Sequence, residues 1–319
     1  VAAGVGAFRI HVDEAHLGGG EGVPGQGLRI AVGQPGFLVA PVHVQVGLPY
    51  VLAAGGEAEG AETAVFEGDV AGEGAAVAVG VLAVVLWHQV DRDGAITLVN
   101  DAIRLDKVTL WIVLVVSVAL LLASLISDDY VTREGLEPAE TYALFMLAAI
   151  GAITMAAAND LIVLFLGLET MSLALYVLVA SHRRRSGGLE GGLKYFILGG
   201  FSSAFFLYGA ALIYGATGST NLSFMVQVFD AVVDLDRSND AIVLAGVALL
   251  LVGLLFKVAA VPFHFWTPDV YQGAPTSVTT FMSVATKVAA FAALIRTFSY
   301  TFADSWTDWN GIVAFVAII

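Results

Sequence analysis

The sequence predicts an all-α protein, a polytopic bundle of transmembrane helices in which one helix is broken. Of its 319 residues, 58% are hydrophobic and only 13% are charged, whereas soluble domains carry about 25% charged residues. Several apolar runs approach the roughly 20 residues that a helix needs to cross a bilayer. Pro262 interrupts one such run, because proline lacks a backbone N–H and clashes with the carbonyl four residues earlier, here that of Val258.

Composition also restricts the chemistry that the chain can perform. Cysteine is absent, which excludes disulfides, thiolate metal sites and a thiol nucleophile. The net charge of −14 argues against a nucleic-acid partner. No HExxH motif or paired histidine–carboxylate spacing places three ligands on one face, so we expect no metal site.

Residues 1–73 differ from the rest, and we expect two regions, 1–73 and 74–319. The first is rich in Gly, Ala, Val and Glu, without a helical or strand period. A glycine-dense run, Gly18 to Gly27, lacks the strand and helix that flank a nucleotide-binding loop. We therefore expect an irregular N-terminal segment, either disordered or produced by a shifted reading frame. No basic region followed by an apolar one opens the chain, so no cleavable signal peptide is expected.

The apolar runs after residue 73 are the expected membrane spans. Ala75–Trp87 is short for a span, Gln89–Lys107 is expected to be a polar connection, and 217–240 a loop that is acidic at its end. The last apolar run stops with the chain, so we expect a fragment. The expected spans are Val108–Ile126, Thr141–Ala158, Leu161–Ala180, Leu193–Tyr214, the broken Ala241–Trp266, Ser277–Phe298 and the final run Gly311–Ile319.

The basic loop Arg183–Arg185 sets the expected orientation, because short loops rich in Lys and Arg stay in the cytoplasm. Alternation then places 127–140 and 267–276 on the same side, with Asn159 and the 217–240 loop outside. The three arginines are also suited to binding anionic lipid or a partner subunit. The two roles are compatible.

Glu169, Lys257 and Lys287 are ionisable residues near the middle of apolar runs. A lysine at mid-membrane costs roughly 2.5–3.5 kcal/mol on insertion scales, so such residues usually face the protein interior or a wet cavity. Both lysines are predicted to carry protons. Glu169 is predicted to be the carboxylate that adjusts the protonation of a buried lysine. The alternatives are a fixed ion pair for Glu169 and Lys257, and a side chain that extends to the interface for Lys287.

Two further residues are weaker candidates. Lys194 lies at the start of its span, where an interfacial lysine without a chemical role is equally typical. His264 follows the break and can relay protons near neutral pH, or serve only as a satisfied polar group.

These residues stand in three motifs, ANDLIVLFLGLETMSLALYVL, GLKYFILGGFSSAFFLYG and LLFKVAAVPFHFWTPDVYQGAPTSVTTFMSVATKVAAF. In them the chain resembles the antiporter-like membrane subunits of the proton-pumping NADH:quinone oxidoreductase, respiratory complex I, and specifically the subunit N family. The resemblance runs from about Gly74 or Asp91 to the end of the chain.

The resemblance implies two inverted repeats, each with one broken helix, of which this chain would hold the first. It implies that Glu169, Lys194, Lys257 and Lys287 occupy the family's proton-pathway positions. It also implies no redox cofactor on this chain, since NAD, FMN, iron–sulfur clusters and quinone belong to partner subunits. The expected partners are other membrane subunits of complex I and the lipid bilayer of a bacterial inner membrane, with no small-molecule substrate beyond protons and water.

Two other functions compete with proton translocation in a redox enzyme. The first is a multisubunit cation/proton antiporter or a hydrogenase-linked relative, which would not purify with NADH dehydrogenase activity. The second is a scaffold that conducts no protons. Four buried charges count against a scaffold, given their cost in a membrane.

Overall fold

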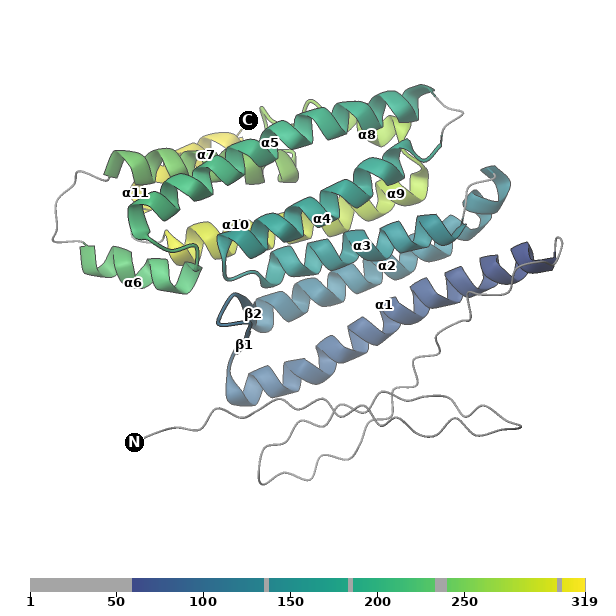
Figure 1. The fold of residues 1–319 in the computed structure, drawn as a ribbon, viewed down its shortest axis with the longest axis horizontal. Coiled ribbons are helices and arrows are strands. Elements are labelled where there is room, and N and C mark those ends of the chain that lie inside the picture. The colour runs from purple at the N-terminus through teal and green to yellow at the C-terminus, as the bar shows by residue number, and fades with distance from the viewer. Residues whose placement is uncertain (1–58, 135–137, 183–185, 233–239, 303–305, 319) are drawn as a thin grey trace, which may run out of the picture. The chain divides into compact units, whose positions relative to one another are not determined.

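The computed structural model describes residues 59–134, 138–182, 186–232, 240–302 and 306–318. Seven helical stretches among them are long and apolar enough to cross a membrane, which confirms the predicted transmembrane bundle (Figure 1). The elements are α1 (Glu59–Asp93), β1 (Ile96–Leu98), β2 (Ile103–Leu105), α2 (Lys107–Glu134), α3 (Pro138–Ala157), α4 (Leu161–Ala180), α5 (Ser186–Thr217), α6 (Leu222–Val232), α7 (Asp240–Val258), α8 (Thr267–Gly273), α9 (Thr276–Phe281), the π-helix η2 (Met282–Thr286), α10 (Lys287–Leu294), the π-helix η3 (Ile295–Thr301) and α11 (Trp306–Ile318).

Helix α4 has the predicted bounds. It starts there because Asp160 caps it: the carboxylate accepts hydrogen bonds from the backbone N–H groups of Ile162 at 2.8 Å and Val163 at 3.4 Å. Those N–H groups have no partner within the helix, so an aspartate at this position stabilises the helix start. This helix carries Glu169 into the bundle.

Helix α1 corrects the sequence analysis. Ala75–Trp87, which was predicted to be short for a span, is the middle of a span-length helix, in which Gly72–Asp93 is apolar enough to cross a membrane. The helix also covers positions up to residue 73 that were expected to be irregular. Gly72, a glycine of that segment, lies at a contact: a Cβ there would lie 3.5 Å from Ser124 of α2 and from Tyr142 of α3, and small residues allow membrane helices to approach closely.

The loop predicted at 217–240 contains helix α6, a second correction. Asn221 caps this helix by accepting a hydrogen bond from the N–H of Phe224 at 2.9 Å. Its residues Leu222 and Met225 are fully buried. The acidic residues had indicated a solvated loop, but those at 233–239 lie outside the described residues, and the apolar half of the segment folds onto the bundle.

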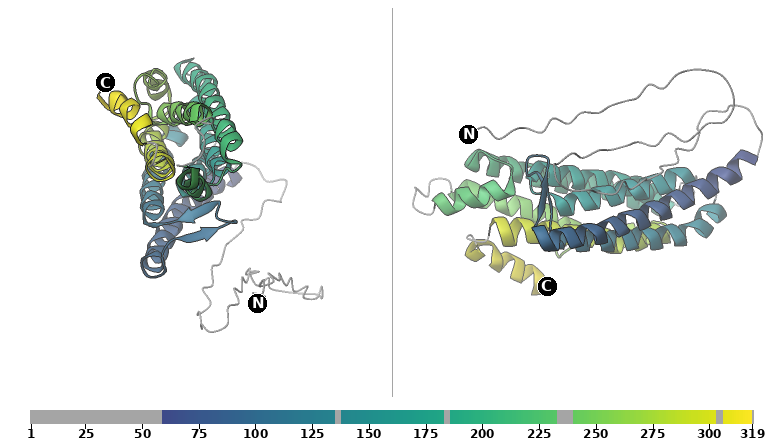
Figure 2. Two further views of the ribbon diagram at one scale, coloured as in Figure 1. Left: turned by 90° about the vertical axis from the view of Figure 1, so that its left-hand side faces the viewer. Right: turned by 90° about the horizontal axis from the view of Figure 1, so that it is seen from below.

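Helices α3 and α4 pack together extensively, as do α5 and α7, and the long helices run side by side (Figure 1, Figure 2). Each pair meets at glycines. A Cβ on Gly151 of α3 would lie 2.8 Å from the carbonyl oxygen of Gly167 in α4, and one on Gly209 of α5 would lie 2.7 Å from that of Gly246 in α7. The absence of a side chain at these positions lets the backbones touch.

The connections gather at two opposite ends of the bundle. At one end, His182 after α4 bonds Glu134 of α2 at 2.7 Å, and α8 lies beside the start of α5. At the other end, the side-chain amide of Asn159 donates to the carbonyl of Asp101 in the β1–β2 turn at 2.8 Å. This arrangement agrees with the predicted alternation. The Arg183–Arg185 loop used to orient the bundle lies outside the described residues.

The predicted broken span, Ala241–Trp266, is helical only as far as Val258, where α7 ends. The second helical half, α8, lies in the stretch 267–276 that was predicted to connect two spans. Helix α7 ends in a Schellman motif: Ala259 takes the left-handed conformation, with φ of 63°, its N–H bonds the carbonyl of Phe256, and the N–H of Ala260 bonds that of Leu255, both at 3.0 Å. The motif satisfies two of the carbonyls that every helix end leaves free. Pro262 follows within the non-helical segment, and α8 resumes at Thr267.

Candidate functional site

Lys257 lies in the last turn of α7, immediately before the break, and only 1% of its surface is exposed. Its ammonium group donates a hydrogen bond to the Ser172 hydroxyl of α4 at 2.6 Å. The Ser172 hydroxyl in turn donates to the Leu168 carbonyl one turn earlier. A buried cation is therefore held by a neutral hydroxyl.

The break brings the second lysine to the first. Because the helix ends after Lys257, its backbone carbonyl has no partner from a following turn. Lys287 at the start of α10 donates its ammonium to that carbonyl at 3.2 Å. A cation at this position is favoured because the carbonyl end of a helix carries partial negative charge. The broken helix thus joins Lys257 and Lys287, which are 30 positions apart in sequence.

Aromatic rings surround both ammonium groups. The Lys257 nitrogen lies 5.6 Å from the ring centre of Tyr176 and 5.2 Å from that of Tyr195. The Lys287 nitrogen lies 4.9 Å from the ring of Trp266, and Trp266 stacks on Tyr195 with ring centres 4.6 Å apart. Ring faces attract cations, and the attraction strengthens when water is excluded. The rings therefore stabilise positive charge without supplying a counter-charge.

Glu169 lies on α4 one turn before Ser172 and is half-buried. Its carboxylate accepts a hydrogen bond from the Ser203 hydroxyl of α5. Among the ion pairs of the described residues, none joins Glu169 to Lys257 or Lys287. The predicted carboxylate and lysines are thus grouped on α4, α7 and α10, but each binds a hydroxyl or a carbonyl rather than its charged neighbour.

Lys194 and His264 lie apart from this group. Lys194 pairs with Glu190 of its own helix at 2.7 Å and with Asp269 of α8 at 2.6 Å, so it ties α5 to the second half of the broken helix. His264 is exposed within the break. Neither residue contacts the two clustered lysines through any hydrogen bond found in the described residues.

The expectation of four buried charges requires correction. Of Glu169, Lys194, Lys257 and Lys287, only Lys257 is fully buried in this chain. Glu169 and Lys287 are half-buried, and the Lys194 side chain is 42% exposed. The cost of burying charge therefore concentrates at Lys257.

The sequence did not single out the neutral residues that hold the charged ones, namely Ser172, Ser203, Tyr176, Tyr195 and Trp266. One signal was available. Ser172 follows Glu169 by three positions and precedes Tyr176 by four, a spacing that places all three on one helix face. Ser203, Tyr195 and Trp266 belong to other segments, and only the tertiary fold brings them to the lysines.

A second buried cation lies at the end of the bundle that carries the β1–β2 turn. Arg296 of η3, 8% exposed, donates to the carboxylate of Asp106 at 2.9 Å and to the hydroxyl of Thr109 at 2.8 Å. Burial alone would raise the pKa of Asp106, but the Thr109 N–H and the Arg296 guanidinium hold that pKa below its ordinary value. Here the cation has a direct counter-charge.

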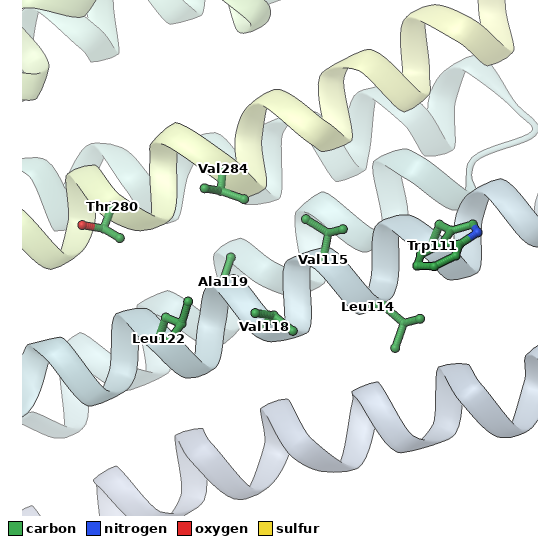
Figure 3. Close-up of a pocket in the computed structure, with 8 residues that line it drawn as sticks. All are labelled: Trp111, Leu114, Val115, Val118, Ala119, Leu122, Thr280 and Val284. Atoms are coloured by element: carbon green, nitrogen blue, oxygen red, sulfur yellow. The ribbon is translucent and has the colours of Figure 1, made fainter.

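The structure also contains an apolar groove of about 300 Å³ between α2 and the α9–η2 segment. Figure 3 shows its lining residues, with Thr280 and Val284 on one side and Trp111 on the other. The Thr280 hydroxyl is already bonded to the carbonyl of Thr276. The groove is lined by no ionisable side chain, so it offers no group for proton transfer. Among the described residues no cluster of three potential metal ligands occurs either.

The bundle, with its seven span-length helices and its broken helix, defines a polytopic membrane protein. Comparison with known proteins gives its family. Residues 158–319 match the family described as NADH:quinone oxidoreductase/Mrp antiporter, TM, and the chain belongs to this family.

Named relatives and a solved structure agree with this family assignment. The chain is 42% identical over 220 residues to NADH-quinone oxidoreductase subunit N of Trichlorobacter lovleyi, a match that covers 69% of this chain and 45% of the relative. It is 50% identical over 194 residues to the protein of that name in a Nocardioides species, covering 60% and 36%. A chain of respiratory complex I from Thermus thermophilus superposes with a TM-score of 0.61 at 35% identity, covering 73% and 48%. The chain thus spans less than half the length of these relatives.

Proposed function

We propose that this chain translocates protons as a membrane subunit of a bacterial NADH:quinone oxidoreductase. Electron transfer from NADH to quinone takes place in partner subunits, and this chain carries no redox group. The observation that carries the proposal is Lys257, a fully buried lysine at the end of a broken helix with a neutral hydrogen-bond partner. Such a lysine can release and regain a proton far more readily than one that is fixed by a carboxylate.

The roles follow from the contacts. Lys257 and Lys287 carry the proton, and the helix break brings them together through the Lys257 carbonyl. Glu169, one turn before Ser172 on α4, contributes negative potential at Lys257, because charges interact more strongly away from bulk water. The non-helical backbone between α7 and α8 provides polar groups beside which water can enter, since such backbone is tolerated in membranes where it borders protein or water.

Lys194 has a supporting role in this proposal. Its ion pairs with Glu190 and Asp269 link α5 to α8. A change in the charge of these residues would therefore shift α8 and, with it, the non-helical segment between α7 and α8. His264 is exposed in the same segment, and its ring nitrogens can donate and accept hydrogen bonds with water. Both are weaker candidates than the clustered lysines because they lie outside the hydroxyl and aromatic contacts.

The experiment replaces each clustered lysine in the full-length subunit within the intact complex. Lys257→Ala and Lys287→Ala should each lower NADH-driven proton uptake in inverted vesicles by at least about tenfold. The matched control is Lys107→Ala, because Lys107 is a lysine of the same chain that pairs with Asp91 on an exposed surface. It should pump at the wild-type rate. Normal pumping by assembled Lys257→Ala complexes would contradict the proposal.

Purification separates this function from a stand-alone antiporter. The relatives at 42–50% identity carry the subunit N name, which supports assembly into an NADH-oxidising complex. The full-length protein should therefore co-elute with NADH dehydrogenase activity in mild detergent. Elution with other transporter subunits and without that activity would favour the cation/proton antiporter.

A further inference from the structure

We propose that Ser172 is a positioning residue for proton transfer, one whose hydroxyl satisfies Lys257 in both of its protonation states. The inference rests on the proposed function of Lys257. It starts from an arrangement that is unusual for a helical serine. A hydrogen bond from a serine hydroxyl to the carbonyl four residues earlier is common in helices. The Ser172 oxygen in addition accepts a hydrogen bond from the ammonium group of Lys257, on another helix, at 2.6 Å.

A hydroxyl at this position can serve both states. It holds one hydrogen to donate and two lone pairs to accept. When Lys257 is protonated, the oxygen accepts from the ammonium and the hydrogen points at the Leu168 carbonyl. When Lys257 is neutral, rotation of the hydroxyl turns that hydrogen towards the lone pair of the amine. The heavy atoms stay in place while the proton leaves and returns.

Burial makes this partner necessary. Ser172 is fully buried and Lys257 is 1% exposed, so no bulk water replaces a lost hydrogen bond, and an unsatisfied buried charge is costly. The Tyr176 and Tyr195 rings attract the ammonium through their faces, but they offer nothing comparable to a neutral amine. The titratable groups that face Lys257 are Glu169 and Tyr176 from α4, Tyr195 from α5 and Lys287 from α10.

The test is the pH dependence of NADH-driven proton uptake by full complexes carrying Ser172→Ala. The alanine removes a hydrogen bond from both states of the lysine, but the bond to the charged state is the stronger one. The alkaline limb of the profile should therefore move lower by up to about one pH unit, because a bond to a charged group is worth about 1 kcal/mol more than a neutral one. The control is Ser117→Ala. Ser117 is a buried serine of α2 with the same bond to the carbonyl four residues earlier, here Val113. Its profile should superpose on that of the wild type.

The outcomes decide between the possibilities. An unchanged alkaline limb in Ser172→Ala would overturn the inference, as would an upward shift, which would mean that Lys257 pairs with Glu169 instead. Should the alanine variant fail to assemble, Ser172→Cys takes its place. A thiol is a weaker acceptor, so a smaller shift in the same direction is expected, and none would contradict the inference. Failure of the proposed function is separate, because it appears as normal pumping in Lys257→Ala.

Discussion

Two buried cations of this protein, Arg296 and Lys257, are held in opposite ways. Arg296 lies near one end of the bundle and has a direct ion pair with Asp106 at 2.9 Å. Lys257 lies at the helix break and has a hydroxyl and two aromatic rings around it. Both are at least nine-tenths buried. Only one is neutralised by an acid.

The residue types match the surroundings. A guanidinium keeps its proton at any physiological pH, whereas a buried ammonium can lose one. Arg296 with its carboxylate is therefore a permanent charge pair that fixes η3 against the start of α2. Lys257 has partners that stabilise charge without making it permanent. Under the proposed function, this chain distinguishes a permanent structural charge from a proton-carrying one by the choice of partner as well as of residue.

The largest effect is expected when Asp106, the carboxylate that pairs with Arg296, is removed. Asp106→Ala leaves Arg296 buried and unpaired, which should destabilise the protein by about 3 kcal/mol, the low end for a broken buried pair because the Asp106 side chain is 28% exposed. We expect a marked loss of assembled complex, measured by thermal unfolding and native gels.

The matched control uses the exposed pair of the same chain. Asp91→Ala breaks the Asp91–Lys107 ion pair, whose side chains are 57% and 53% exposed. Exposed pairs are worth less than about 1 kcal/mol, so this variant should assemble normally. Equal losses in the two variants would show that Asp106 supplies no special stabilisation to Arg296.

A smaller effect is expected on the pH dependence of stability. The pKa of Asp106 is lower in the folded protein than its ordinary value, so its contribution to stability is complete above about pH 4, the ordinary aspartate value, and is lost as pH falls through the lower folded value. Thermal unfolding of wild type and Asp106→Asn, compared from pH 6 to pH 3, should therefore converge at the acid end. A difference that stays constant down to pH 3 would contradict this account.

The membrane helices were largely predictable because their apolar runs have the length of a span. Leu161–Ala180 was predicted with the bounds that α4 has. The failures had local causes. Glycines suggested an irregular chain over residues 1–73, although α1 already begins at Glu59 and places Gly72 against Ser124 of α2. The acidity of the 217–240 loop obscured the apolar residues that form α6.

The candidate site was only half predictable. Charged residues in apolar runs are conspicuous, so Glu169, Lys257 and Lys287 were found from the sequence. Their partners were not, because a serine or tyrosine in a membrane helix is unremarkable until a lysine from another helix reaches it. Ser172 meets Lys257 across 85 positions of sequence. Such contacts follow from the helix packing, which no local pattern specifies.

The most direct test exchanges the two kinds of cation while keeping the charge. Lys257→Arg retains a positive group beside Ser172 but prevents deprotonation, and Arg296→Lys retains a positive group beside Asp106. NADH-driven proton uptake is measured in vesicles holding the full-length complex, with assembly verified for each variant. We predict that Lys257→Arg assembles and loses most of its pumping, whereas Arg296→Lys keeps most of it. Near-normal pumping by assembled Lys257→Arg complexes would show that Lys257 is a fixed charge like Arg296 and would contradict the account.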